Sequence, residues 1–307
     1  MNKIVLQQVQ HNPERSRRVG LVIDEGADLP KEIIEKYQIA VVPVKMDWPE
    51  IENLPGGNTF QKMREAEKQG IKSFGKTSQP SPKDFLNAFK KQLERFDKII
   101  CITLTSKLSG TYNSACQAKN ILGSEGEKIF IIDSLNATCG EALSDLRAID
   151  LIEAGKGAEE ISEDLEAFRP KIVLRGILKD PKWLEASGRI SSTIANWVRK
   201  MEKLGLRPLI GIKKGVIKAV GIKAGAKDIP TALFKEFEGR IKSLLRENKK
   251  IRTTITHGDN LEAAQKLKEM LESNFKGTEV AFINLIDNVL GVLLGPDALI
   301  LAWCEIT

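Results

Sequence analysis

Short apolar runs alternate with amphipathic helix patterns along much of this chain, and this alternation restricts its fold more than any other feature. Examples of such runs are "VGLVID" (19–24), "IICITLT" (99–105) and "KIFIID" (128–133), and a helix pattern follows each of them. Strands that are separated by helices usually pair in parallel, because the helix returns the chain to the same end of the sheet. The sequence therefore predicts an α/β domain with a mostly parallel sheet flanked by helices.

The alternation changes in the second half of the chain. The stretch "LRPLIGIKKGVIKAVGIKAG" contains two apolar runs joined at Lys214 and Gly215, residues typical of a tight hairpin turn, so we expect antiparallel pairing there. The chain of 307 residues is long enough for two domains. We therefore predict a flexible N-terminal arm at 1–17, an α/β domain at 18–165 and a second, α+β domain at 166–307.

The loop after the run at 99–105 carries small polar residues. It contains Ser109 and Gly110, and the next helix pattern begins at Thr111. A strand, a tight loop and a helix in succession place these residues at the carboxyl edge of the sheet, where open α/β sheets bind ligands. Anions favour the N-terminus of a helix as well.

Three more residues could join this edge. Thr77 and Ser78 lie on another loop that we expect there, and His257 ends a strand pattern in the second half. Hydroxyl, amide and imidazole groups can donate hydrogen bonds to a carboxylate. Serine and threonine at such junctions also serve as helix caps, and a single histidine at a strand end is often structural, so both interpretations stay open.

The stretch "GIKSFGKTSQPS", which begins at Gly70, matches the phosphate-loop pattern G-x-x-x-x-G-K-[ST]. A phosphate loop follows a buried strand and opens a helix at its GKT. Here a helix pattern ends at Gly70, and Pro80 and Pro82 prevent a helix from continuing through Thr77. We interpret the match as accidental, and a nucleotide-using transferase that works through Lys76 remains a rival hypothesis.

A serine hydrolase is the second rival. Ser109 at a strand-to-helix turn and a distant His257 resemble a nucleophile and its base. The G-x-S-x-G elbow is missing, however, and no acidic partner stands out, so no catalytic residue is assigned. A dinucleotide site is not expected either, because the first turn "DEGADLP" has one glycine where the fingerprint needs three.

Composition excludes several classes of function. The net charge is +6 with both signs interspersed, which argues against nucleic-acid binding. No apolar run approaches the roughly 18 residues of a membrane span, and the N-terminus lacks the features of a signal peptide, so we expect a cytoplasmic protein. Four dispersed cysteines and two histidines predict free thiols and no metal site. The basic tract "KKGVIKAVGIKAGAK" is either the polar face of a hairpin or a docking surface for an acidic partner.

Several segments carry a resemblance to a known family. They are "TSQPSPKDFLNAF", "ITLTSKLSGTYNSA", "IFIIDSLNAT", "LEASGRIS" and "ITHGDNLEAA", and they occur in the order and spacing of the DegV family. From about Val19 to its C-terminus the chain resembles these fatty-acid-binding proteins, which are called FakB in fatty acid kinase systems. The resemblance implies an α/β first domain, a smaller α+β second domain, and an acyl chain in a tunnel between or beneath them.

The resemblance also implies roles for individual residues. Thr77 and Ser109 match the family's carboxylate-binding threonine and serine, while His257 and Arg189 match a histidine and an arginine near the site. Proteins of this kind are not enzymes by themselves. They present a long-chain fatty acid, their only bound small molecule, to the catalytic subunit of a fatty acid kinase, which makes an acyl phosphate from ATP. Transient contact with a membrane is compatible with this role.

The chain departs from the family at three places. Glu25 replaces a hydroxyl residue near the expected head-group site, "EAS" precedes Gly188 where basic residues are common, and "GVLLGPDA" (291–298) stands where a His-Thr-Gly-Pro-Gly segment is expected. An acid at Glu25 would repel a bound carboxylate unless it is protonated or turned away. If these changes have closed the tunnel, the chain would instead be an interaction or regulatory protein.

Overall fold

The computed structural model describes residues 19–247 and 249–306, and the predicted arm at 1–17 lies outside this part of the chain. The first sheet has the order β2-β1-β5-β6 and all its neighbours are parallel, so the predicted α/β class is confirmed. Its strands are β1 (Val19–Asp24), β2 (Ala40–Val42), β5 (Lys98–Thr103) and β6 (Ile129–Asp133).

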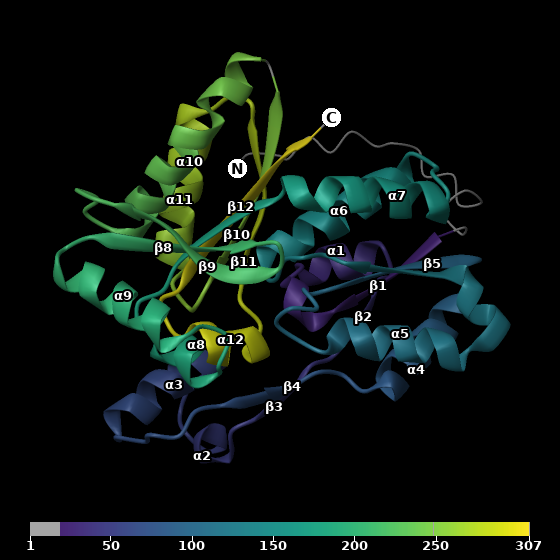
Figure 1. Ribbon diagram of the computed structural model, residues 1–307, viewed down its shortest axis with the longest axis horizontal. Coiled ribbons are helices and arrows are strands. Elements are labelled where there is room, and N and C mark those ends of the chain that lie inside the picture. Colours follow the sequence, from purple (N-terminus) through teal and green to yellow (C-terminus); the bar gives the residue numbers. More distant parts are fainter. Residues whose placement is uncertain (1–18, 248, 307) are drawn as a thin grey trace.

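Helices cover both faces of this sheet (Figure 1). On one face Phe85 and Ala115, from α4 (Pro82–Leu93) and α5 (Thr111–Ile121), pack on Cys101 of β5. On the other face lie α6 (Cys139–Glu153) and α7 (Ala158–Phe168). Side chains of a strand alternate between the faces, which is why an uninterrupted apolar run such as "IICIT" is needed in β5.

The second sheet has six strands in the order β11-β10-β12-β7-β8-β9. β10 and β11 are parallel and the other neighbours are antiparallel. The predicted hairpin is confirmed, with Lys214 at φ 51° and Gly215 at φ 79° in its turn. The strands are β7 (Val173–Ile177), β8 (Arg207–Lys213), β9 (Val216–Lys223), β10 (Lys250–His257), β11 (Thr278–Leu285) and β12 (Leu299–Ile306).

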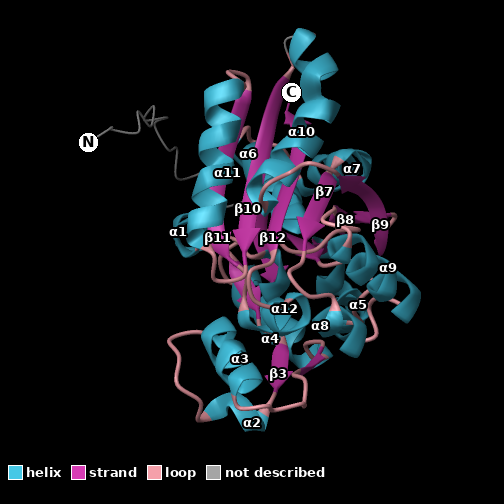
Figure 2. Ribbon diagram, turned by 90° about the vertical axis from the view of Figure 1, so that its left-hand side faces the viewer, coloured by secondary structure: helices cyan, strands magenta, loops and turns pink. Residues whose placement is uncertain are grey.

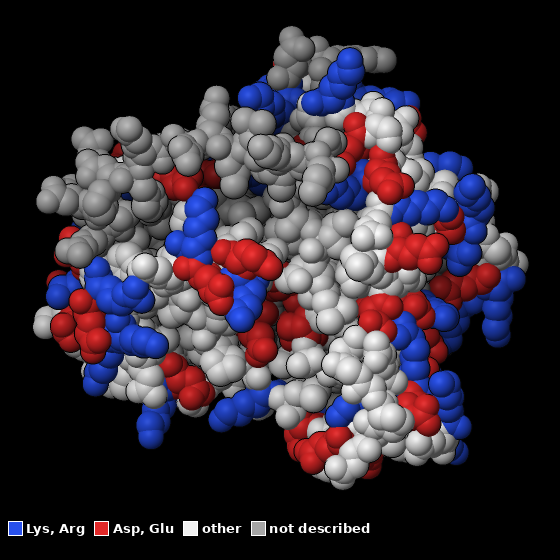
Figure 3. All heavy atoms as spheres, turned by 180° about the vertical axis from the view of Figure 1, so that it is seen from behind, with Lys and Arg blue, Asp and Glu red and all other residues white. Residues whose placement is uncertain are grey.

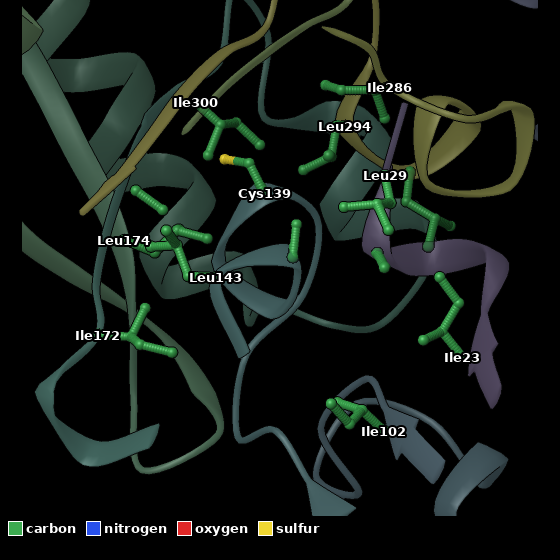
Figure 4. Packing of buried hydrophobic residues seen from close by; sticks show 14 of the residues in the cluster. Ile23, Leu29, Ile102, Cys139, Leu143, Ile172, Leu174, Ile286, Leu294 and Ile300 are labelled. Carbon is green, nitrogen blue, oxygen red and sulfur yellow. The ribbon is translucent and has the colours of Figure 1, made fainter. Parts of the chain in front are cut away.

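Helix α6 lies between the two sheets (Figure 1), and Figure 2 shows the strands of the second sheet. Its side chains belong to the largest core cluster, which also contains residues of β5 and β12. Figure 4 shows Cys139 and Leu143 of α6 beside Leu174 of β7 and Ile300 of β12. The far face of the second sheet is covered by α10 (Ile229–Arg246) and α11 (Leu261–Asn274). Since one core joins the sheets, the predicted boundary at residue 165 stays a prediction.

A separate segment closes one end of the molecule, at the bottom of Figure 1. It consists of the two-stranded ribbon β3 (Lys45–Asp47) and β4 (Lys76–Ser78) with α2 (Pro49–Glu52) and α3 (Thr59–Lys68). α3 packs against α12 (Asn288–Leu294), and Arg64 of α3 forms ion pairs with Asp259 and Asp297 from the second half.

The remaining elements are short connections around this frame. They are α1 (Lys31–Lys36), α8 (Lys182–Ala186), α9 (Ser192–Lys203) and the 3-10 turns η1 (Glu25–Ala27), η2 (Gly123–Lys128) and η3 (Arg169–Lys171). α8 contacts α12, and the Trp183 ring of α8 lies 5.9 Å from that of Trp48, between the β3 strand and α2.

Gly295, which ends α12, supplies a test of this packing. Its φ of 82° is a conformation that other residues rarely adopt, and a Cβ there would lie 2.1 Å from the Trp183 ring. We expect Gly295→Ala to lower the free energy of unfolding by more than about 2 kcal/mol in urea denaturation. Gly239→Ala is the control, because a Cβ at this exposed position in α10 meets nothing within 4 Å, and it should stabilise the protein by about 0.5–1 kcal/mol. Equal effects of the two changes would contradict the packing described.

Candidate ligand-binding site

A cavity of about 220 Å³ lies at the carboxyl edge of the first sheet, against the second sheet and α12. Gly26 follows β1, Leu104 follows β5 and Ala137 follows β6, and all three line it. This is the edge at which the sequence places the hydroxyl-bearing loops, and at which open α/β sheets bind ligands. The second sheet supplies the opposite wall.

Most of the cavity wall is apolar. Its aliphatic side chains come from the β2–β3 connection, the β5 loop, β7, α8, β8, β9, α12 and β12. Figure 4 shows two of them, Leu174 and Ile300, on neighbouring strands of the second sheet. A mostly apolar wall of this kind suits an apolar ligand, with polar groups needed only where the ligand carries them. The aliphatic lining consists of Val44, Leu104, Leu108, Leu174, Leu184, Ile210, Ile212, Ile217, Val289, Leu290, Leu293, Leu294 and Ile300.

The polar part of the wall contains five of the predicted site residues. Thr77 and Ser78 of β4, Ser109 and Gly110 before α5, and Arg189 after α8 line this same cavity. Thr77 lies in strand β4 and not on a loop as predicted, while Ser109 lies on the loop before α5, so the structure brings together from separate segments the two residues on which the site prediction depends. Hydroxyl and guanidinium donors on one cavity are the groups that a carboxylate accepts from.

Arg189 lies directly beside Thr77. Its Nη2 donates to Thr77 Oγ1 at 3.2 Å and its Nη1 to the carbonyl oxygen of Ser187 at 3.0 Å. Burial lowers the pKa of this half-buried guanidinium, which nevertheless stays charged at neutral pH. Within residues 19–247 and 249–306, no carboxylate forms an ion pair with it.

Thr111 supports the site from behind. It is the first residue of α5, it is buried, and its Oγ1 lies 2.8 Å from Ser109 Oγ, so the two hydroxyls share a hydrogen bond. Thr111 does not line the cavity itself. Its effect on a ligand would therefore act through the orientation of the Ser109 hydroxyl.

His257 lies at the end of β10, as predicted, but not on the cavity wall. Its Nδ1 accepts a hydrogen bond from the backbone amide of Asn260 at 3.1 Å, and burial lowers its pKa. Both observations favour a neutral imidazole at physiological pH. Its assignment to the site stays a prediction.

Two further polar residues line the cavity and were not assigned from the sequence. Gln79 follows Thr77 and Ser78 and lies against Gly110, where an added Cβ would come within 2.7 Å of its amide nitrogen. Its position in the sequence, directly after the assigned Thr77 and Ser78, could have indicated that Gln79 also lines the site. Thr138, before α6, has φ 50° and ψ −142°, an unusual conformation for a β-branched residue. Nothing in the sequence indicates that strain.

The departure at Glu25 does not place a charge in the cavity. Glu25 Oε2 accepts a hydrogen bond from the backbone amide of Val44 at 3.1 Å, and Glu25 is not a lining residue. The carboxylate is thus turned toward the backbone, the condition under which it would not repel a bound anion. The departure at 291–298 forms the end of α12, whose Leu293 and Leu294 extend the apolar wall.

Buried carboxyl groups lie behind the polar end of the cavity. Asp24 at the end of β1 accepts from the amides of Gly26 at 2.8 Å and Leu104 at 2.7 Å, two residues that line the cavity. Burial raises the pKa of Asp24 to about 7 and that of Asp287 to about 6. It also raises the pKa of Glu141 and Asp145 well above their usual range. The two strand ends beside the cavity are therefore held by a group that titrates near neutrality.

The rival active sites find little support in the geometry. Lys76 and Thr77 lie in strand β4, paired with β3, and no helix begins there, which confirms that the phosphate-loop match is accidental. The hydroxyl of Ser109 bonds to Thr111, and His257 bonds to Asn260, so these two do not form a nucleophile and base pair.

The described residues also bear on the expectations on surface charge, membrane spans, metal sites and cysteines. On the face shown in Figure 3, basic and acidic side chains alternate without a basic stripe. No helix among the described residues has the length and hydrophobicity to cross a bilayer. In the same part of the chain, no group of three or more His, Cys, Asp and Glu side chains is placed to hold a metal ion. All four cysteines are free thiols.

The sequence and the fold both match known proteins. The family model described as "Uncharacterised protein, DegV family" matches residues 18–305. A DegV domain-containing protein of Clostridium perfringens is 31% identical over 259 residues, covering 84% of this chain and 88% of that protein. Among solved structures, a fatty-acid-binding DegV family protein from Thermus thermophilus has a TM-score of 0.79 at 26% identity, covering 94% of this chain and 100% of that one. A DegV lipid-binding protein from Thermotoga maritima has a TM-score of 0.72 at 25% identity, covering 94% and 99%.

The buried carboxyl groups predict a stability that falls between pH 5.5 and 8. A carboxyl whose folded-state pKa is raised contributes stability that is complete below its unfolded pKa and is lost as the pH rises through the folded value. For Asp24, with an ordinary pKa of 3.8 and a folded value of about 7, the loss across this window is about 2 kcal/mol. Urea denaturation at the two pH values measures it.

Asp24→Asn is the matched variant, because it removes the titrating group. Its free energy of unfolding should depend less on pH than that of the wild type. His257, with a pKa lowered by burial, acts in the opposite direction in this window, so the comparison of the two proteins isolates Asp24. Equal pH dependence in both proteins would show that Asp24 is not the responsible group.

Proposed function

This chain belongs to the DegV family, and on that premise we propose that it binds a long-chain fatty acid in the cavity and presents the carboxylate to a fatty acid kinase subunit. The observation that carries the proposal is the meeting of Thr77 and Ser109 on one cavity whose other walls are mostly aliphatic. The solved relatives from Thermus thermophilus and Thermotoga maritima, described as fatty-acid-binding and lipid-binding, support the ligand class.

The acyl chain supplies most of the affinity. Burying about fourteen methylenes at ~0.8 kcal/mol each gives roughly 11 kcal/mol before the costs of ordering. The volume of about 220 Å³ between the aliphatic walls is many times the roughly 10–15 Å³ that a cavity needs to hold one water molecule. This size is an argument against a closed tunnel and a purely regulatory protein.

The carboxylate fixes the orientation of the ligand. Thr77, Ser78 and Ser109 supply hydroxyls, Gly110 supplies a backbone amide before α5, and Arg189 supplies a positive charge beside Thr77. Each bond from such a donor to a charged acceptor contributes about 1.5–3 kcal/mol. The head group is therefore held at the edge of the cavity while the tail lies among the aliphatic side chains.

The chain positions the reactant and performs no bond-breaking step itself. In the proposed transfer, a carboxylate oxygen attacks the γ-phosphorus of ATP held by the kinase subunit. The new oxygen–phosphorus bond forms as the bond to the bridging oxygen of the leaving ADP breaks, and the products are acyl phosphate and ADP. We place this exchange in the cytoplasm, with transient membrane contact as the route by which the fatty acid is acquired.

Fatty-acid binding is directly testable. Native mass spectrometry of protein purified from cells should show an acyl chain of C14 to C18, and delipidated protein should bind added palmitate in isothermal titration. Ligand-free protein that also rejects a series of fatty acids would refute the proposal.

Variants at the polar end test the head-group contacts. Thr77→Ala and Ser109→Ala should each weaken palmitate binding by about tenfold, because a charge-assisted hydrogen bond is lost. Ser106→Ala is the matched control: Ser106 precedes Ser109 on the same loop and is not a lining residue. Thermal denaturation of all three variants checks that each of them is folded. Unchanged affinity in both Thr77→Ala and Ser109→Ala would remove these residues from the site.

A further inference from the structure

A second hollow, of about 730 Å³, lies next to the cavity on the outside of the molecule. We call it the outer groove. Its walls come from the segment 47–50 around the end of β3 and the start of α2, from 73–77 leading into β4, and from Ala186, Ser187 and Arg189 after α8. Residues 73–76 of the "GIKSFGKTSQPS" stretch line it, and the proposed fatty-acid site does not use them.

The outer groove and the cavity share two residues, Thr77 and Arg189. Their side chains are joined by the hydrogen bond from Arg189 Nη2 to Thr77 Oγ1 at 3.2 Å. This pair is therefore the partition between the two hollows. A carboxylate bound at Thr77 lies one side chain away from the groove, so a group attached to that carboxylate would extend into it.

The partition and the groove beside it carry two cationic side chains, Arg189 and Lys76, that form no ion pair among the described residues. Arg189 uses two of its five N–H donors on Thr77 and on the carbonyl of Ser187, and among the described residues it has no ion pair. Lys76, exposed in the groove and adjacent to Thr77, likewise forms no ion pair within that part of the chain. Three N–H donors of Arg189 and the ammonium group of Lys76 are therefore available to an anionic group in the groove.

We propose that the outer groove is a phosphate subsite, in which Arg189 and Lys76 hold the phosphate of the acyl phosphate while the acyl chain stays in the cavity. This inference rests on the proposed function and adds to it the location of the phosphoryl group. A carboxylate bears one negative charge, whereas an acyl phosphate bears close to two, so the second cation matters for the product and little for the fatty acid. The lysine that suggested a phosphate loop thus acts through its side-chain charge alone.

The groove also contains acidic side chains, which should weaken phosphate binding there. Asp47 and Glu50 line it, and Asp47 stands opposite Lys76 in the β3–β4 register. Neither acid forms an ion pair among the residues described. They make the groove a poor site for free phosphate, so only a phosphate delivered by a bound acyl chain should occupy it. Removing the Asp47 charge should strengthen phosphate binding.

The test compares two ligands of equal chain length on the full chain. One is palmitate and the other is a stable acyl phosphate analogue, a 2-oxoalkylphosphonate in which a methylene replaces the bridging oxygen. Isothermal titration measures both affinities for the wild type, Lys76→Ala, Asp47→Asn and the control Lys72→Ala. Lys72 is exposed on the same stretch, four residues earlier, and does not line the groove.

Lys76→Ala should weaken phosphonate binding by about fivefold and leave palmitate binding unchanged. Asp47→Asn should tighten phosphonate binding, and Lys72→Ala should change neither ligand. The wild type should bind the phosphonate more tightly than palmitate at low salt, and this difference in affinity should shrink as salt is added. Equal effects of Lys76→Ala on both ligands, or none on the phosphonate, would overturn the subsite while leaving fatty-acid binding intact. Failure of the wild type to bind either ligand would instead refute the proposed function.

Discussion

The packing of one helix between two sheets determines the rest of this structure. α6 packs on β5 of the first sheet with one side and on β10 and β12 of the second with another, and its residues belong to the core cluster that contains both. This contact sets the carboxyl edge of a parallel sheet against the face of a mixed one. Strands that end there leave loops and backbone groups in place of side-chain packing. The cavity is the space that remains between that edge, the second sheet and α12.

The division of the cavity into apolar and polar parts has a simple energetic basis. Aliphatic walls supply a large, undirected affinity for a chain, and a few donors supply direction. Thr77 and Arg189 line both hollows, so one hydrogen bond separates the mostly aliphatic cavity from the outer groove. In the proposed transfer, the kinase subunit must reach the carboxylate from outside the cavity, which agrees with a head group held at this partition.

The sequence did not indicate the buried carboxyl groups near the cavity. Asp24 accepts from two backbone amides at the ends of β1 and β5, which keeps Gly26 and Leu104 in place at the cavity wall. Its oxygens satisfy strand-end donors that no neighbouring strand reaches. The same burial raises its pKa to about 7, so the bonds that shape the wall depend on a group whose charge changes near neutrality. The carboxyl oxygens of Glu141 and Asp145 of α6, also buried, have no hydrogen-bond partner among the described residues.

The sequence by itself determined the elements and their class, because strand and helix periods, the Lys214–Gly215 turn and the proline positions are local. It also placed Ser109 and Gly110 at the carboxyl edge, since a strand, loop and helix in succession have one arrangement in a parallel sheet. The sequence also suggested Thr77 and Ser109 as hydroxyl donors at one sheet edge, and the resemblance to a family identified them as the carboxylate-binding pair. Only the tertiary structure decided that Glu25 turns to the Val44 amide, that Gln79 and Thr138 join the wall, that His257 does not, and that Arg189 bonds to Thr77. Those contacts join residues from distant segments, and their geometry depends on how α6, α8 and α12 pack, which no short stretch of sequence encodes.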